Sequence, residues 1–158
     1  MSADDVSYGL IAAVRSLKGL QAEVSARLGL RLELPALGLL STLEQHGGSR
    51  LSAVAELLRL DLSSVSRQVA TLERDGLVRR ERDPHDQRAS LLHLSPAGEA
   101  LLQRVRATRA ALLREDLAGW SPADLSAFAA ALERFAADTA HRPAGSAPAV
   151  PAALLETR

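Results

Sequence analysis

The stretch from Asp61 to Ser95 limits the possible folds of this chain most, because it places a helix, a sharp stop and a hairpin one after another. Within residues 63–73, apolar side chains recur at the spacing of one stripe of an α-helix. This stripe comprises Val65, Val69 and Leu72. The opposite face carries hydroxyl and guanidinium groups. The pattern predicts a helix with one buried face and one outward face that suits polar or charged partners.

A helix stop and a hairpin follow. Glycine suits the left-handed position after a helix, so Gly76 is expected to end it. Residues 77–82 and 89–94 are β-prone runs that flank a turn containing Asp and Pro at 83–88, which predicts a two-stranded hairpin. Residues 51–60 predict another short helix upstream. Two short helices joined by a brief turn form a helix-turn-helix unit.

This stretch resembles the recognition helix and wing of the MarR family of winged helix-turn-helix regulators. Four pieces carry the resemblance in order: Ser-Ser-Val-Ser-Arg at the helix start, Leu-Glu-Arg-Asp-Gly-Leu-Val at its exit, Asp-Pro-His-Asp-Gln-Arg-Ala in the wing, and Leu-Ser-Pro-Ala-Gly after it. A weaker match extends from about Asp5 to Asp138. The resemblance implies a mainly α fold with a small β-hairpin, in which a winged helix-turn-helix domain carries N- and C-terminal dimerisation helices.

The length of 158 residues suggests one domain. We expect a single MarR-like domain over 1–142, with a DNA-binding lobe at about 50–95. Dimerisation helices are expected at about 4–28 and 122–140. Residues 143–158 are rich in Pro and Ala, a composition typical of a flexible tail.

The apolar stripes of the two terminal helices need a partner, and another copy of the chain is the simplest one. The resemblance implies a homodimer in which these helices interlock. Residues expected at this interface are Val6, Leu10, Leu125 and Leu132. A symmetric dimer would place two recognition helices about one DNA turn apart, ~34 Å, and so fit a pseudo-palindromic operator.

The outward face of the recognition helix offers donors for the major groove of double-stranded DNA. Arg67 can donate two hydrogen bonds to guanine, and Gln68 can pair with adenine. Short hydroxyls near the helix N-terminus suit phosphates or base edges, because the helix dipole favours anions there. These are Ser63, Ser64, Ser66 and Thr71. An ordinary solvated surface is the alternative interpretation of this face.

The resemblance makes Arg88 the wing arginine that enters a minor groove, where a narrow A·T groove concentrates negative potential. Asp86 is expected to hold the Arg88 guanidinium by a charge-assisted hydrogen bond, and Arg82 to reach phosphates. A structural turn without a DNA role is the alternative for Asp86 and Arg88. Basic and acidic residues number 19 each, which argues mildly against a nucleic-acid binder. Any positive face must therefore come from the placement of the arginines.

The resemblance also implies a repressor that releases DNA when a small, often aromatic, effector binds. Its crevice would lie between the dimerisation helices and the DNA-binding lobe. Four leucines are candidates to line an apolar pocket, with core packing as the alternative use. They are Leu17, Leu20, Leu39 and Leu43.

Several other classes of function lack support in the sequence. The chain has no cysteine, and its four histidines show no metal-ligand spacing, so we expect no metal or cofactor. No apolar run reaches the roughly 18 residues of a membrane span, which favours a cytoplasmic protein. No phosphate loop or nucleophile elbow indicates an enzyme. Aromatic side chains are expected in the core rather than around a ligand; these are Trp120, Phe128 and Phe135. An architectural or protein-binding winged helix remains an alternative.

Overall fold

The computed structural model describes residues 3–30 and 34–140, which fall into two compact units, one up to Asp116 and one from Leu117. The first unit contains α1 (Ala3–Leu28), α2 (Leu34–His46), β1 (Ser49–Arg50), α3 (Leu51–Leu58), α4 (Leu62–Arg74), β2 (Val78–Asp83), β3 (Asp86–Leu94) and α5 (Pro96–Asp116). The second unit contains α6 (Pro122–Ala140). The mainly helical fold with a small sheet is confirmed. The tail expected over 143–158 lies outside the described residues.

The predicted hairpin is confirmed as β2 and β3, but the sheet has three antiparallel strands in the order β1-β3-β2, and the sequence pattern did not predict β1. Strand β1 is only Ser49–Arg50 and pairs with Leu92 and Leu91 of β3. It forms because Gly47, with a φ of 63°, turns the chain back after α2. A strand of two residues has no periodicity to detect, which is why the sequence pattern missed it.

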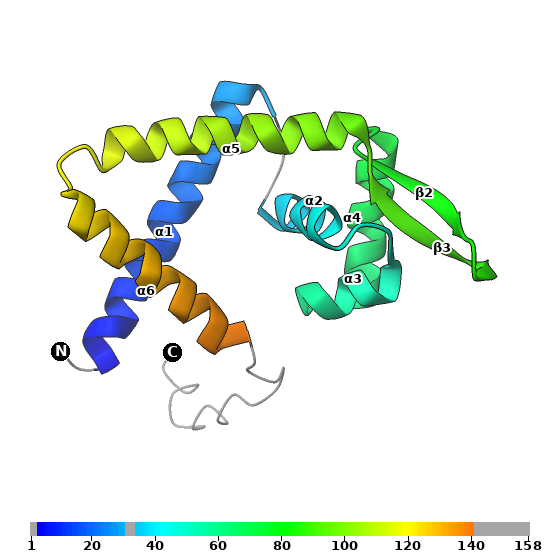
Figure 1. Cartoon of the computed structure of the whole chain (residues 1–158), viewed down its shortest axis with the longest axis horizontal. Coiled ribbons are helices and arrows are strands. Elements are labelled where there is room, and N and C mark those ends of the chain that lie inside the picture. The colour runs from blue at the N-terminus through cyan, green and yellow to red at the C-terminus, as the bar shows by residue number, and fades with distance from the viewer. Residues whose placement is uncertain (1–2, 31–33, 141–158) are drawn as a thin grey trace, which may run out of the picture. The chain divides into compact units, whose positions relative to one another are not determined.

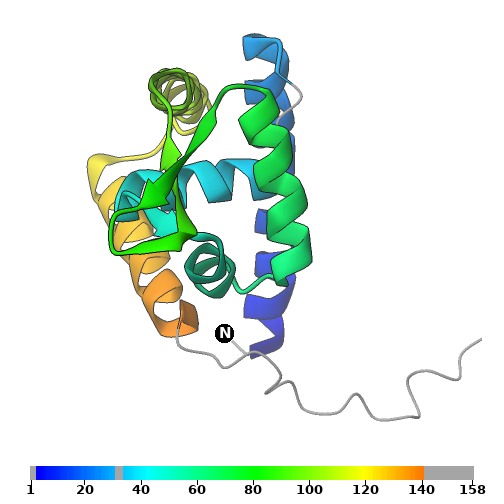
Figure 2. The ribbon, with the colours of Figure 1, turned by 90° about the vertical axis from the view of Figure 1, so that its right-hand side faces the viewer.

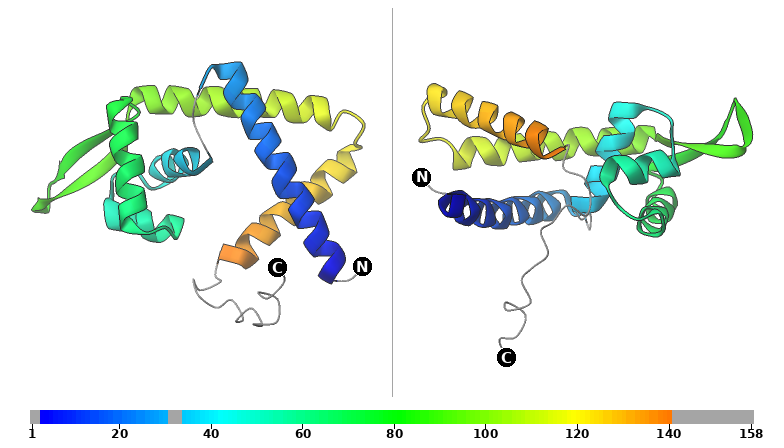
Figure 3. Two further views of the ribbon diagram at one scale, coloured as in Figure 1. Left: turned by 180° about the vertical axis from the view of Figure 1, so that it is seen from behind. Right: turned by 90° about the horizontal axis from the view of Figure 1, so that it is seen from below.

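Strands β2 and β3 form the long hairpin of the first unit, from Val78 opposite Leu94 to Arg82 opposite Ser90. In Figure 1 this hairpin projects beyond the helices at the end where α5 begins. It faces the viewer in Figure 2, with α4 beside it. The left view of Figure 3 shows α3 against one end of α4, and these two helices are in contact.

The core of the first unit is built from aliphatic side chains of α2, α4, the sheet and α5. Within α4 the predicted stripe is buried: Val65, Val69 and Leu72 are at most 1% exposed. They pack with fully buried residues of neighbouring elements, including Leu39, Leu40, Leu92 and Leu102. Burying each such side chain contributes roughly 1.5–3 kcal/mol. The inward face of α4 is thereby fixed, which leaves the opposite face free for another partner.

The exit of α4 and the start of α5 are joined by hydrogen bonds through Ser95. The Ser95 hydroxyl donates to the carbonyl of Gly76 at 2.6 Å and accepts from the N–H of Gly98 at 3.0 Å. The Ser95 N–H donates to the carbonyl of Leu77 at 3.0 Å. A Cβ on Gly98 would lie 2.3 Å from that same carbonyl oxygen, so only glycine allows this approach. The recognition helix and α5 therefore share one tight junction.

The two terminal helices expose apolar side chains in the single chain. On α1, Val6 is 54% and Leu10 44% exposed, and on α6, Leu132 is 52% exposed. The prediction that the aromatics lie in a core was wrong for the single chain, because Trp120, Phe128 and Phe135 are 42–48% exposed. Trp120 and Phe128 do pack edge to face, with ring centroids 5.3 Å apart. No helix in the described residues is long and apolar enough to cross a membrane.

Candidate nucleic-acid interface

The start of α4 is capped by Asp61. Its Oδ1 accepts a hydrogen bond from the main-chain N–H of Ser64 at 2.8 Å and from the Ser63 hydroxyl at 2.5 Å. These bonds, above all that from Ser63, hold the pKa of the Asp61 carboxyl far below its usual range, since they stabilise the charged form. The cap satisfies donors that the first turn of a helix otherwise leaves unpaired. Because the Ser63 hydroxyl donates its proton to Asp61, it has no proton left to donate to a DNA phosphate.

The outward face of α4 carries a ladder of polar contacts. Arg67 Nη2 donates to the Ser64 hydroxyl at 3.3 Å, and Thr71 donates to the Arg67 carbonyl at 3.2 Å. Arg74 Nη2 in turn donates to the Thr71 hydroxyl at 3.2 Å. Ser66 and Arg67 are exposed. The guanidinium of Arg67, which forms one weak hydrogen bond here, retains donors for an edge of a base pair.

Gln68 is less exposed than the outward face that the sequence analysis assigned it to. Its side-chain oxygen Oε1 is buried and has no hydrogen-bond partner among the described residues. Gln68 also lines a cleft on this side of α4. Its oxygen is therefore turned inward, and the expectation that it pairs with adenine on the outward face does not fit this placement.

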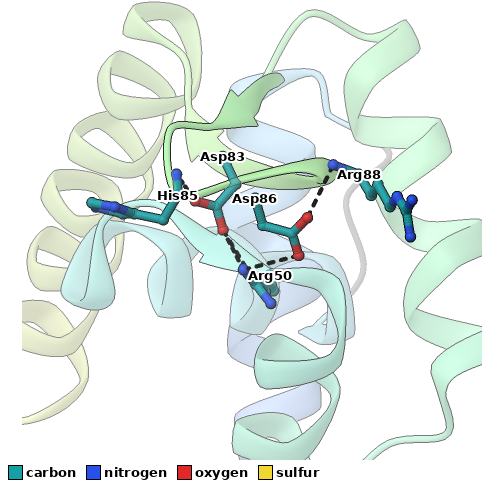
Figure 4. Close-up of polar contacts among 5 residues, drawn as sticks. All are labelled: Arg50, Asp83, His85, Asp86 and Arg88. Carbon is teal, nitrogen blue, oxygen red and sulfur yellow. Dashed lines mark hydrogen bonds and ion pairs between the residues drawn. The ribbon is translucent and has the colours of Figure 1, made fainter.

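The hairpin tip is tied to β1 by an arginine that sequence analysis missed. Arg50 donates from Nε at 3.0 Å and from Nη2 at 2.6 Å to Asp83 Oδ2, and Nη2 lies 3.6 Å from Asp86 Oδ2 (Figure 4). The Arg50 guanidinium lowers the pKa of the Asp83 carboxyl, and Asp83 raises the pKa of Arg50. Arg50 and Asp83 are 33 positions apart, so no local motif indicates this pair.

Asp86 does not hold the guanidinium of Arg88, contrary to the sequence-based expectation. Its Oδ1 accepts from the main-chain N–H of Arg88 at 3.0 Å, and its other oxygen faces Arg50 (Figure 4). The reason is geometric, because a carboxylate two residues before an N–H closes a local turn that needs no long side chain. The Arg88 guanidinium is left exposed, at the tip of the hairpin.

The arginines of the hairpin fall into two groups. Arg80 binds Glu73 of α4 through Nε at 3.0 Å and Nη2 at 3.2 Å, and Arg79 pairs with Glu81. Within the part of the chain that the structure describes, Arg82 and Arg88 have no acidic side chain within 4.0 Å. Only these two carry an uncompensated charge along the hairpin. The geometry thus separates Arg82 and Arg88, which the sequence analysis named for the wing, from Arg79 and Arg80, which have acidic partners.

A cleft of about 850 Å³ lies beside α4 in the first unit. It is lined by Gly29 and Leu30, which follow α1, and by the start of α2. Arg67, Gln68 and Thr71 of α4 and Ala97, Ala100 and Arg104 of α5 also line it, among others. The effector crevice expected between the dimerisation helices and the DNA-binding lobe stays a prediction. The lining residues differ from those expected.

None of the four leucines proposed for a ligand pocket lines this cleft. Leu39 and Leu43 are 0% and 1% exposed within the core, so they serve packing instead. Leu20 is partly buried against that core, and Leu17 is 48% exposed. Arg104 and Ala100, which do line the cleft, belong to a helix whose periodicity alone gave no sign of a binding role. Among the described residues, no cluster of three or more potential ligands could hold a metal ion.

Comparisons with known proteins agree with this geometry. The model of the MarR family matches residues 32–90, which span α2 to β3. The HTH-type transcriptional regulator YxaD of Bacillus subtilis, whose function is uncharacterized, is 35% identical over 103 residues, which cover 65% of this chain and 72% of YxaD. The crystal structure of Rv1404 from Mycobacterium tuberculosis superposes with a TM-score of 0.77 at 25% identity, covering 91% of this chain and 98% of that one.

A further solved structure resembles the chain and contains a bound molecule. It is the PcaV transcriptional regulator from Streptomyces coelicolor, in complex with its natural ligand. The TM-score is 0.61 at 26% identity, and the match covers 86% of this chain and 97% of PcaV.

Proposed function

The chain belongs to the MarR family of DNA-binding transcriptional regulators, and from this premise we propose that it is a homodimeric repressor released from its operator by a small ligand. In this proposal α4 enters the major groove of a pseudo-palindromic site. The hairpin β2–β3 is the wing, and Arg88 enters the adjacent minor groove.

One observation carries the proposal: α4 buries one face completely, while its other face and the neighbouring wing expose guanidinium groups without acidic partners. Arg67 on α4 can bind guanine O6 and N7 with two donors. Arg88 supplies a free cation at the wing tip, and Arg82 supplies one on β2. Ser66 is exposed beside Arg67 for a phosphate contact. A chain without net charge thus gathers unpaired positive charge on the two elements that DNA would touch.

The exposed stripes of α1 and α6 support the dimer. Val6 and Leu10 on α1, with Leu125 and Leu132 on α6, are each at least 39% exposed in the single chain. Exposed apolar surface of this kind is costly in water and typical of an interface between subunits. A second copy would cover it and would double the number of arginines that face DNA.

The cleft beside α4 supports ligand control. Its lining combines the apolar side chains of Leu30, α2 and α5 with the guanidinium groups of Arg67 and Arg104, and with Gln68, whose side-chain oxygen is buried. Asp75 is the one carboxylate of this lining. Two cations against one anion favour a small ligand with an acidic group and an apolar body, such as an aromatic acid. A ligand that engages Arg67 would compete directly with the base contact proposed for it.

Footprinting on the DNA upstream of the chain's own coding region tests the proposal. Two protected half-sites about ten base pairs apart are expected, and an aromatic acid that binds the cleft should abolish them. A scrambled duplex of equal length is the control. Equal affinity for both duplexes at several salt concentrations would contradict sequence-specific binding, while a footprint that no ligand weakens would contradict only the release step.

A further inference from the structure

The wing has an intrinsic weakness at its tip. The hairpin turns at Pro84 and His85, and its register shifts between Arg82 and Asp83. Two-stranded ribbons that stand away from a core are marginally stable in water. The position of Arg88 therefore depends on whatever orders the tip.

Arg50 supplies an anchor from outside the hairpin. It ends β1 and directly precedes Leu51, the first residue of α3, so its backbone belongs to the helix-turn-helix lobe. Its guanidinium reaches across β3 to the carboxylates at both ends of the turn, Asp83 and Asp86 (Figure 4). The side chain of Asp83 is only 7% exposed, whereas that of Asp86 is 42% exposed. The contact to Asp83 is the shorter one and is shielded from water.

Each carboxylate also accepts a hydrogen bond from the main chain of the tip. The second oxygen of Asp83 accepts from the N–H of His85 at 2.9 Å, and the second oxygen of Asp86 accepts from the N–H of Arg88 at 3.0 Å. A guanidinium orients each carboxylate on one side, and each carboxylate then fixes a main-chain N–H on the other. Arg50 is in this way linked to the backbone of Arg88 without touching its side chain.

We propose that Arg50 is a positioning residue for the wing, which holds the tip through Asp83 and Asp86 and so sets the direction from which the Arg88 side chain meets DNA. This inference rests on the proposed function, in which Arg88 enters the minor groove. It adds a coupling between two parts of the interface, because the same residue joins the wing tip to the first residue of α3. The other possible role of this half-exposed guanidinium, a direct contact to a phosphate, is an outcome of the test below.

The first experiment needs no DNA. Hydrogen exchange of the main-chain amides of His85 and Arg88 is measured by NMR in the full-length protein. Arg50→Ala should accelerate exchange at both amides about tenfold or more, because local opening governs protection. Asp83→Asn should accelerate exchange at His85 more weakly, since the amide oxygen still accepts that hydrogen bond while the pairing with Arg50 loses its charge.

Arg80→Ala is the matched control for this experiment. It removes one positive charge from the same sheet, but Arg80 lies on β2 and binds Glu73 and Ser90, not the carboxylates of the tip. Protection of the His85 and Arg88 amides should be unchanged in it. Arg50→Lys keeps the charge without the two-donor geometry and should give intermediate exchange, which keeps the test decisive if Arg50→Ala folds poorly. Unchanged protection in both Arg50 variants would overturn the proposal.

The second experiment is a double-mutant cycle on operator DNA with Arg50→Ala and Arg88→Ala. Each single variant should weaken binding about five- to tenfold. In the double variant, loss of Arg50 should add less than about twofold, because Arg50 acts through Arg88. Additive losses, with a further decrease in salt dependence on removing Arg50, would overturn positioning and assign Arg50 to a phosphate.

The two proposals fail in different ways. If Arg88→Ala keeps full operator affinity, the wing assignment in the proposed function is wrong, and the positioning role is wrong with it. If Arg88→Ala weakens binding while Arg50→Ala leaves it unchanged, only the positioning role is wrong.

Discussion

Asp61 and Arg67 have different roles, the first at the N-cap of α4 and the second on its outward face. Asp61 accepts from the N–H of Ser64 and from the Ser63 hydroxyl, and so stabilises the first turn. Arg67 is exposed one turn further on and has one weak internal hydrogen bond. The Ser63 hydroxyl therefore stabilises the start of the helix. Arg67 is the residue of this face for which we propose a contact to a base.

Replacement of Asp61 by Ala should lower the melting temperature by about 4 °C near neutral pH, because a helix N-cap is lost. The pKa of Asp61 is depressed in the folded state, so its contribution is present above the ordinary carboxyl pKa of about 3.9 and decreases as the pH falls below it. The difference between variant and wild type should therefore shrink on acidification. Thermal melts at pH 7 and pH 3 measure this difference in melting temperature. Asp61→Asn is the control, because an Asn side chain can still cap the helix. A difference that grows toward pH 3 would contradict this role.

Arg67→Ala should cost about 1–3 kcal/mol on the specific operator and relax the preference at one base pair. The reason is the loss of a two-donor contact to a base edge. Competition titrations with operator and scrambled DNA give the specificity ratio. If the variant keeps the wild-type ratio, Arg67 does not recognise a base.

At the scale of elements, hydrogen bonds join the end of α4 to the start of α5. Ser95 binds both Gly76 and Gly98, and Gly98 brings the first turn of α5 against the Leu77 carbonyl. The inward face of α4 and its exit are thus both fixed.

Gly98→Ala should destabilise the protein by about 1–3 kcal/mol, because the new Cβ meets a main-chain oxygen that cannot rotate away. Denaturant unfolding followed by circular dichroism measures this change. Gly119→Ala is the matched control, since a Cβ there meets nothing within 4 Å. Equal midpoints for the two variants would show that the junction adapts freely.

At the scale of the whole molecule, we expect one set of residues to form the dimer and another to bind DNA. The stripes of α1 and α6 expose apolar surface, whereas the wing exposes charge. If the stripes form the dimer and the wing binds DNA, mutations in each set should have different consequences for assembly.

Leu10→Asp or Leu132→Asp should abolish dimer and DNA binding together, since an unpaired charge buried in an interface costs several kcal/mol. Arg88→Ala should keep the dimer, weaken operator binding and reduce the salt slope by about one phosphate-equivalent per wing. Sedimentation combined with binding titrations at several salt concentrations separates these effects. A monomeric Arg88→Ala protein, or a dimeric Leu10→Asp protein with full affinity, would contradict the division.

Local sequence determined the elements of this protein. The spacing of Val65, Val69 and Leu72 places the buried face of α4, and Gly76, with a φ of 71°, ends the turn that follows it. Ser95 and Pro96 mark the start of α5. Each of these signals acts within a few residues, because helix periodicity, caps and turns depend on neighbouring backbone groups.

The tertiary structure alone decided which charges remain free. Whether an arginine of the wing is free or paired depends on residues distant in sequence: Glu73 neutralises Arg80, whereas Asp83 and Asp86 bind Arg50 and leave the Arg88 guanidinium exposed. The inward turn of the Gln68 oxygen and the lining of the cleft depend in the same way on how α4 packs beside α5. Side-chain pairing across such separations has no periodicity in the sequence, because it is set by the packing of whole elements and not by the local conformation of the chain.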